Sequence, residues 1–140
     1  MTQEDKELLL RDICARLPYG VKCKYYDICE GAYDEGKICG FERQEYVHIN
    51  GACVHIEEVK PYLFPMSSMT EEQKNQLKEI WDVDMNKALD YAISGEEGLS
   101  DLFQLSAAEK IINWLDKNKF DYRGLIPKGL ALDATNLNIY

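Results

Sequence analysis

Hydrophobic residues recur at helical spacing at the start of the chain. Thr2 and Asp5 match an N-cap, with acidic side chains at the positive end of the helix dipole. Pro18 and Gly20 end the pattern, because proline disfavours helix before it and glycine permits a sharp turn. We therefore predict a packing helix within residues 1–18. Its apolar face comprises Leu10, Ile13, Cys14 and Leu17.

Between residues 21 and 56 hydrophobic residues recur at every second position, which is typical of β-strands. They occur in short runs rich in tyrosine, valine, isoleucine and cysteine. Four or five antiparallel strands in so short a segment indicate a small, strongly curved sheet or an SH3-like barrel, and the pattern does not separate these two. The first predicted strands are 21–25, 37–41 and 45–49, with turns at 34–36 and 42–44.

The dipeptide Asn50-Gly51 predicts a two-residue hairpin, because both residues accept the positive φ of a type I′ turn. A two-residue loop also defines the register of strands 45–49 and 52–56. The predicted cross-strand pairs are Ile49 with Ala52, His48 with Cys53, Val47 with Val54 and Tyr46 with His55. Alternation then places Tyr46, His48, Cys53 and His55 together, opposite the apolar face.

Residues 57–70 read as a linker in which the pattern changes from strand to helix. Pro61 and Pro65 exclude regular helix there. This segment must therefore be anchored by its large apolar side chains, which are Tyr62, Leu63, Phe64 and Met66. If they point inward, the linker is the seam of one domain; if they point outward, it is an interaction site.

Residues 71–140 read as a helical half. Thr70 and Gln73 form a capping box, and Ser106 and Glu109 form a second one that opens a later helix. We expect a break at 82–84, and an extended or short helical tail after residue 119. The prediction is thus a single α+β domain over 1–140. It comprises a helix at 1–18, a β half at 21–56, a linker at 57–70 and a helical half at 71–140.

Charge restricts the partners that we expect. The net charge of −9 is unfavourable for direct binding to nucleic acid or to an anionic membrane, and no basic cluster compensates for it. No apolar run is long enough to span a bilayer, and the N-terminus lacks a signal-like segment. Five cysteines without a Cys-x-x-Cys pair fit reduced thiols better than a disulfide scaffold. We therefore expect a cytoplasmic protein.

One group of residues has side chains that could bind a metal ion. His48, Cys53 and His55 would bring two imidazoles and a thiolate onto one face of the hairpin, which suits zinc. Structural zinc normally takes four ligands, so an ordinary half-exposed sheet face is the competing interpretation. Adjacent carboxylates show no sign of burial, and no glycine-rich phosphate-binding pattern occurs. We assign no catalytic residue and expect no cofactor.

Three segments of the sequence resemble a set of uncharacterised small proteins of Bacteroides-type gut bacteria and their prophages or mobile elements. These segments are 58–72, 114–116 and 120–132. The resemblance implies a bacterial or phage origin. It brings no activity with it, so no functional residue is carried over.

These observations favour a non-enzymatic accessory or protein-interaction protein, whose partner is another protein or a second copy of the chain. One alternative is a metal-binding protein that uses the hairpin at 45–56. Another is an acidic nucleic-acid mimic, suggested by the charge of −9 and by the phage resemblance. Such a mimic needs carboxylates in a stripe at phosphate-like spacing.

Overall fold

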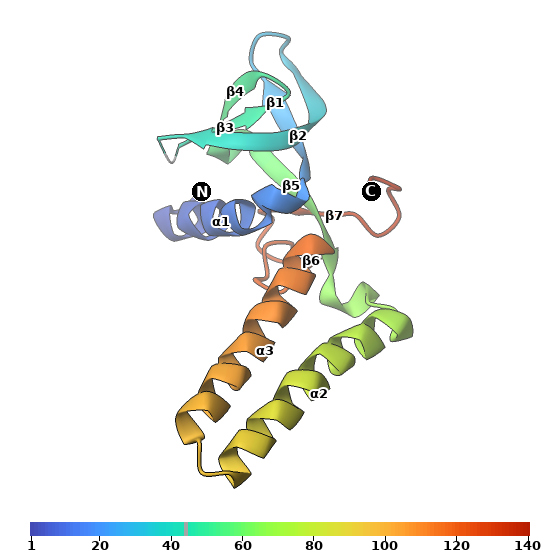
Figure 1. Ribbon diagram of the computed structural model, residues 1–140. Helices are drawn as coiled ribbons and strands as arrows, with labels where there is room; N and C mark the ends of the chain where they lie inside the picture. Colours follow the sequence, from blue (N-terminus) through green and yellow to red (C-terminus); the bar gives the residue numbers. More distant parts are fainter. Residues whose placement is uncertain (44) are drawn as a thin grey trace. The chain divides into compact units, whose positions relative to one another are not determined.

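The computed structural model describes residues 1–43 and 45–140, and it confirms the α+β class (Figure 1). The chain divides into two compact units. The β unit comprises residues 1–66 and 119–140, and the helical unit comprises residues 67–118. The helices are α1 (Gln3–Arg16), α2 (Glu71–Ile93) and α3 (Glu97–Lys117), with short 3-10 turns at Leu17–Tyr19, Ile56–Glu58 and Met66–Ser68.

The β unit is built on a seven-stranded mixed sheet. Its strands are β1 (Lys22–Asp27), β2 (Ala32–Glu42), β3 (Tyr46–Ile49), β4 (Ala52–His55), β5 (Val59–Pro65), β6 (Phe120–Asp121) and β7 (Leu132–Asp133). The order is β4-β3-β2-β1-β5-β6, and β7 also pairs with β5. Strands β1 to β5 pair antiparallel, whereas β6 and β7 run parallel to β5. No pair among the described residues closes this path into a barrel.

The predicted hairpin is confirmed in every pair, with His48 opposite Cys53 and Tyr46 opposite His55. Asn50 and Gly51 have φ values of 51° and 89°, as a type I′ turn requires. On the inner face Val47, Ile49 and Val54 are buried. A local turn signal therefore determined both the register and the buried face.

The predicted turn at 34–36 is wrong, because β2 runs straight through these residues. The chain instead reverses at 28–31, where Gly31 has a φ of 66°. Gly36 serves a different purpose within the strand, since a Cβ there would clash with the Ile49 side chain. The predicted turn at 42–44 includes residue 44, which lies outside the described residues.

The predicted linker at 57–70 is also wrong, because half of it, Val59–Pro65, is strand β5. The prolines do exclude helix, but the φ of proline is compatible with an extended strand. The first half of β5 pairs with β1, and its second half pairs with β6 and β7. Strand β5 therefore lies inside the sheet.

The helical half predicted at 71–140 ends at residue 117, because the tail returns to the β unit. The Asp121 carboxylate accepts hydrogen bonds from the backbone N–H groups of Leu125 and Ile126. At the end of the chain, the Tyr140 hydroxyl accepts a hydrogen bond from the Lys22 N–H at 3.1 Å and donates one to the Tyr62 carbonyl at 2.9 Å. These hydrogen bonds anchor the end of the chain to β1 and β5.

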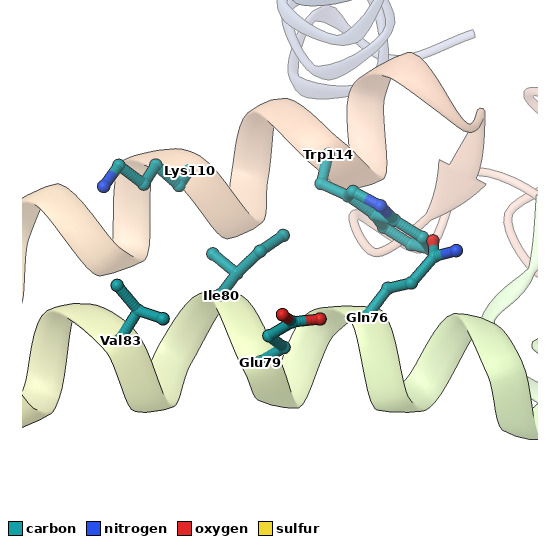
Figure 2. A pocket seen from close by; sticks show the side chains of 6 residues that line it. All are labelled: Gln76, Glu79, Ile80, Val83, Lys110 and Trp114. Atoms are coloured by element: carbon teal, nitrogen blue, oxygen red, sulfur yellow. The ribbon is translucent and has the colours of Figure 1, made fainter.

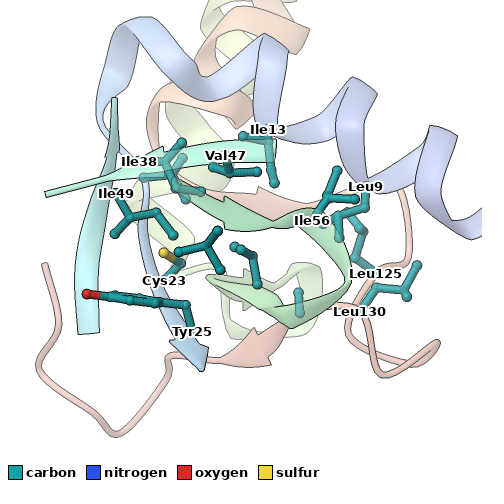
Figure 3. Close-up of a cluster of buried hydrophobic side chains, with 14 of the residues drawn as sticks. Leu9, Ile13, Cys23, Tyr25, Ile38, Val47, Ile49, Ile56, Leu125 and Leu130 are labelled. Atoms are coloured by element: carbon teal, nitrogen blue, oxygen red, sulfur yellow. The ribbon is translucent and has the colours of Figure 1, made fainter. Parts of the chain in front are cut away.

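The β unit has a continuous core to which α1, the sheet and the tail contribute (Figure 3). Leu125 and Leu130 of the tail pack near Leu9 of α1. The core cluster consists of Leu9, Ile13, Val21, Cys23, Tyr25, Ile38, Val47, Ile49, Val54, Ile56, Val59, Leu63, Leu125, Leu130 and Ala131.

A buried ionic cluster fastens α1 to the tail. The Arg16 guanidinium donates two hydrogen bonds of 2.8 Å to the Asp12 carboxylate and a third to the Phe120 carbonyl. Arg123 donates to the same carboxylate at 2.8 Å. This corrects the predicted α1 face, because Asp12 and Arg16 are buried whereas Cys14 is exposed. Asp12 and Arg16 are neighbours on one helix face, but the Phe120 carbonyl and Arg123 that complete the cluster lie more than 100 residues away, so helical periodicity could not indicate the burial of the pair.

In the helical unit, the Thr70 and Gln73 capping box is confirmed at the start of α2. The predicted break at 82–84 is wrong, because α2 is continuous to Ile93. The helix start predicted at Ser106 is also wrong, since α3 already begins at Glu97. Both errors have one cause: Asp84 and Ser106 bind each other across the two helices instead of capping them.

Candidate functional site

The two helices of the helical unit contact each other along one stripe of each. The buried or half-buried residues include Leu77, Ile80, Asp84, Ala88 and Tyr91 on α2, and Ser100, Phe103, Ala107, Ile111 and Trp114 on α3. The rings of Tyr91 and Phe103 stack with centroids 5.2 Å apart. Most large side chains in this contact are only half-buried. The interhelical contact therefore provides only a thin core.

Both helices also carry apolar side chains outside this contact. Trp81, Met85, Leu89 and Ile93 recur every four residues on α2, a spacing that places them along one side of the helix. Met85 is half-buried and the others are exposed. The exposed large hydrophobic side chains of the unit are Trp81, Val83, Leu89, Ile93, Leu99, Leu102, Leu105 and Ile112. Val83 lines the groove between the two helices, and we call the other members of this set the outer apolar surface.

The outer apolar surface needs an explanation, because many large apolar side chains are exposed on two helices, and extensive exposed apolar surface marks interaction sites. A helix in a two-helix hairpin has one covered stripe, whereas a helix in a four-helix bundle contacts neighbours on two sides. Helices α2 and α3 have the composition of the second kind. The helical unit thus has the pattern of one half of a bundle.

A groove of about 460 Å³ lies between the two helices (Figure 2). Ile80, Val83 and Trp114 form its apolar walls. Gln76, Glu79 and Lys110 place polar groups around them. The groove adds an apolar depression to the surface of the helical unit.

A polar cluster connects α2 and α3 near the middle of both helices. Asp84 is 1% exposed, and its carboxylate accepts hydrogen bonds from Lys110 at 2.7 Å and from Ser106 at 3.2 Å. The Lys110 ammonium holds the pKa of Asp84 below its ordinary value. The other carboxylate oxygen, Oδ1, has no hydrogen-bond partner among the described residues. A buried carboxylate with a single lysine partner favours one alignment of α2 and α3 over others.

A second candidate site lies on the outer face of the β3–β4 hairpin. The structure brings together Glu42, His48 and Cys53, whose ligand atoms all lie within 4.8 Å of one another. His48 Nε2 is 3.7 Å and Cys53 Sγ is 3.9 Å from Glu42 Oε2. Two of the three predicted metal-binding residues are therefore adjacent, and the third member of the group is one that the sequence reasoning missed.

His55, the remaining predicted ligand, lies elsewhere on the hairpin. Its ring meets Tyr46 edge-on at 5.4 Å, and its Nδ1 accepts a hydrogen bond from the Glu57 N–H. Glu42 could have been found only through the pairing of β2 with β3, because the sequence prediction placed it in the turn at 42–44 and not in a strand. The information that the sequence lacked was thus the register of β2 against β3, which places Glu42 beside the hairpin.

The residues predicted to form an interaction patch on the linker do not share one exposed face. Tyr62 is 4% exposed, and its hydroxyl donates to the Glu35 carboxylate at 2.6 Å. Burial, together with Glu35, raises the pKa of Tyr62 to about 12. Phe64 is half-buried beside the rings of Phe120 and Tyr140, whereas Met66 is 42% exposed. The outer apolar surface of the helical unit is therefore the stronger interaction candidate.

Comparison of the chain with protein-family models, with curated proteins and with solved structures finds no match. Within residues 1–43 and 45–140, no helix combines the length and the apolar character that a membrane crossing requires. The functional argument therefore starts from the two surfaces described above.

Proposed function

We propose that this protein is a non-enzymatic protein-interaction protein that self-associates through the outer apolar surface of α2 and α3. The observation that carries the proposal is the second apolar stripe of α2, at Trp81, Met85, Leu89 and Ile93. A helix that packs against two neighbouring helices needs a second apolar stripe of this kind.

A second copy of the chain is the partner that this surface fits best. Two hairpins supply the four helices of a bundle, and a two-fold axis places the same patch on both sides of the interface. Leu102, Leu105 and Ile112 of α3 are exposed like the stripe of α2, so both helices of each copy can contribute. The interface would then bury the side chains that a monomer leaves in water.

Charge adds a condition to this association. Residues 67–118 contain eleven acidic residues and five lysines, so two copies repel each other at low ionic strength. Salt screens this repulsion and leaves the apolar attraction intact. We therefore expect dimerisation to strengthen as salt rises. The proposal includes a cytoplasmic location, which the odd number of cysteines supports.

The test is the mass of the full chain in solution, by sedimentation or light scattering across a dilution series. We expect a dimer whose dissociation shows at low concentration. Ile93→Glu should give a monomer, because it places a charge on the α2 stripe. Ile28→Glu is the matched control, since Ile28 and Ile93 are both isoleucines that are 77% exposed, in the β unit and the helical unit respectively.

Two results would overturn the proposal. One is a wild-type monomer at about 100 μM, a concentration well above that at which specific dimers form. The other is equal weakening of the dimer by Ile28→Glu and Ile93→Glu. Circular dichroism of both variants should match the wild type, because exposed substitutions seldom unfold a protein.

A further inference from the structure

We propose that the outer face of the β2–β3–β4 strands binds one divalent transition-metal ion, of which Zn²⁺ fits best, through Glu42, His48 and Cys53. This site is independent of the proposed self-association, because all three residues belong to the β unit.

The fold delivers one ligand from each of three neighbouring strands. His48 of β3 lies directly opposite Cys53 of β4 and opposite Gly40 of β2. Directly opposite residues share a face of the sheet, and so do residues two apart on one strand, which places Glu42 beside them. Val47 and Ile49 alternate to the buried face. The three ligands therefore point away from the core, into solvent that a metal ion can reach.

The distances suit a tetrahedral ion. Zinc binds nitrogen and oxygen at about 2.0–2.2 Å and sulfur at about 2.3 Å, so neighbouring ligand atoms lie about 3.3–3.7 Å apart. Glu42 Oε2 is 3.7 Å from His48 Nε2 and 3.9 Å from Cys53 Sγ. Small side-chain rotations close the difference. Gly40 leaves room beside the site, because a Cβ there would meet only the His48 Cβ, at 4.0 Å.

The ligand types narrow the choice of metal. A thiolate, an imidazole and a carboxylate together suit Zn²⁺, whereas Mg²⁺ and Ca²⁺ prefer oxygen ligands alone. Three protein ligands leave a fourth position for water. Binding requires loss of the Cys53 thiol proton, so a proton is released and affinity rises with pH. Arg43, whose Nε is 3.8 Å from Glu42 Oε1, is the neighbouring cation that competes for the carboxylate.

The register explains why Glu42 replaces the predicted ligand His55. His55 lies two residues beyond Cys53 on β4, roughly 7 Å along the strand, and Tyr46 occupies the position opposite it. His55 Nδ1 also accepts a hydrogen bond from the Glu57 N–H, which gives that imidazole another partner. The proposed site therefore spans β2, β3 and β4, whereas the site expected from the sequence lay on the β3–β4 hairpin alone.

The experiment is a calorimetric titration of the reduced, full-length protein with Zn²⁺, repeated with Co²⁺ to record the thiolate-to-metal absorption band. We expect one ion per chain and binding that tightens between about pH 6 and pH 8. Cys53→Ser should remove the thiolate band. His48→Ala and Glu42→Gln should each weaken binding by more than about 10-fold, because each removes a direct ligand.

Two control variants make the test specific. Cys29→Ser alters another exposed thiol, and His55→Ala alters the histidine that the structure excludes; both should leave affinity unchanged. Ile93→Glu should also bind normally, which separates this site from the proposed dimer. Absence of one-to-one binding, or insensitivity to both Cys53→Ser and His48→Ala, would refute the site. A loss in His55→Ala equal to that in His48→Ala would overturn the role assigned to Glu42.

Discussion

The two units of this protein bury their apolar residues to very different extents. The β unit surrounds a continuous cluster from Leu9 to Ala131 with a mixed sheet, α1 and the returning tail. The helical unit, by contrast, has α2 with only Asp84 and Ala88 buried among its described residues. The β unit therefore has a buried hydrophobic core, whereas the helical unit leaves most of its large apolar side chains partly or fully exposed. The contrast in burial is the reason for the proposed self-association through the helical unit.

The largest effect is expected in the buried ionic cluster of the β unit, in which Arg16 pairs with Asp12. Arg16→Ala should destabilise the β unit by about 3–5 kcal/mol, because it leaves the Asp12 carboxylate buried with one fewer partner. Urea unfolding followed by circular dichroism measures this effect. Arg11→Ala, at an exposed arginine of the same helix, is the control and should cost little. Equal effects would mean that the cluster contributes nothing to stability.

Matched truncations compare the two units directly. Ile13→Ala should cost about 2–5 kcal/mol, because the side chain is fully buried and its loss leaves a cavity. Leu105→Ala, at a side chain that is 67% exposed, should cost less than about 0.5 kcal/mol in dilute protein. Unfolding at high protein concentration should show a larger cost for Leu105→Ala, since the proposed dimer buries this residue. A cost that is independent of concentration would contradict burial in a dimer.

A smaller effect is expected at Gly36 of β2. Gly36→Ala should destabilise the β unit by about 1–3 kcal/mol, because the added methyl group overlaps the Ile49 side chain. Gly40→Ala in the same strand is the control, since its nearest neighbour outside the adjoining residues would be 4.0 Å away. Thermal melting distinguishes the two. Equal melting temperatures would show that Ile49 can move aside freely.

The smallest expected effect concerns the Asp84–Lys110 pair and its dependence on pH. The pKa of Asp84 is lowered in the folded state, so the pair stabilises the hairpin fully above the ordinary carboxylate pKa of about 3.9. This contribution disappears as the pH falls through the lowered pKa of the folded state. Lys110→Met should therefore lower the melting temperature at neutral pH and have little effect in strong acid. A difference that is constant with pH would exclude the pair as its cause.

Sequence reasoning succeeded at two positions where local interactions determine the structure. Asn50-Gly51 specified the hairpin register down to the pair of His48 with Cys53, because turn geometry acts over neighbouring residues. The capping box at Thr70 likewise marked the start of α2. The same local rule failed at Ser106, where a long-range hydrogen bond to Asp84 replaced the cap.

The amino-acid pattern by itself therefore determined the α+β class, the hairpin and its two faces, and the presence of apolar helices near the end of the chain. Only the tertiary structure decided that Asp12 and Arg16 are buried, that Glu42 joins His48 and Cys53, and that α2 keeps an uncovered stripe. The physical reason is that charge burial and strand neighbours depend on residues far away in the chain. Periodicity indicates that a helix face is apolar, whereas only the packed structure shows whether another element covers it.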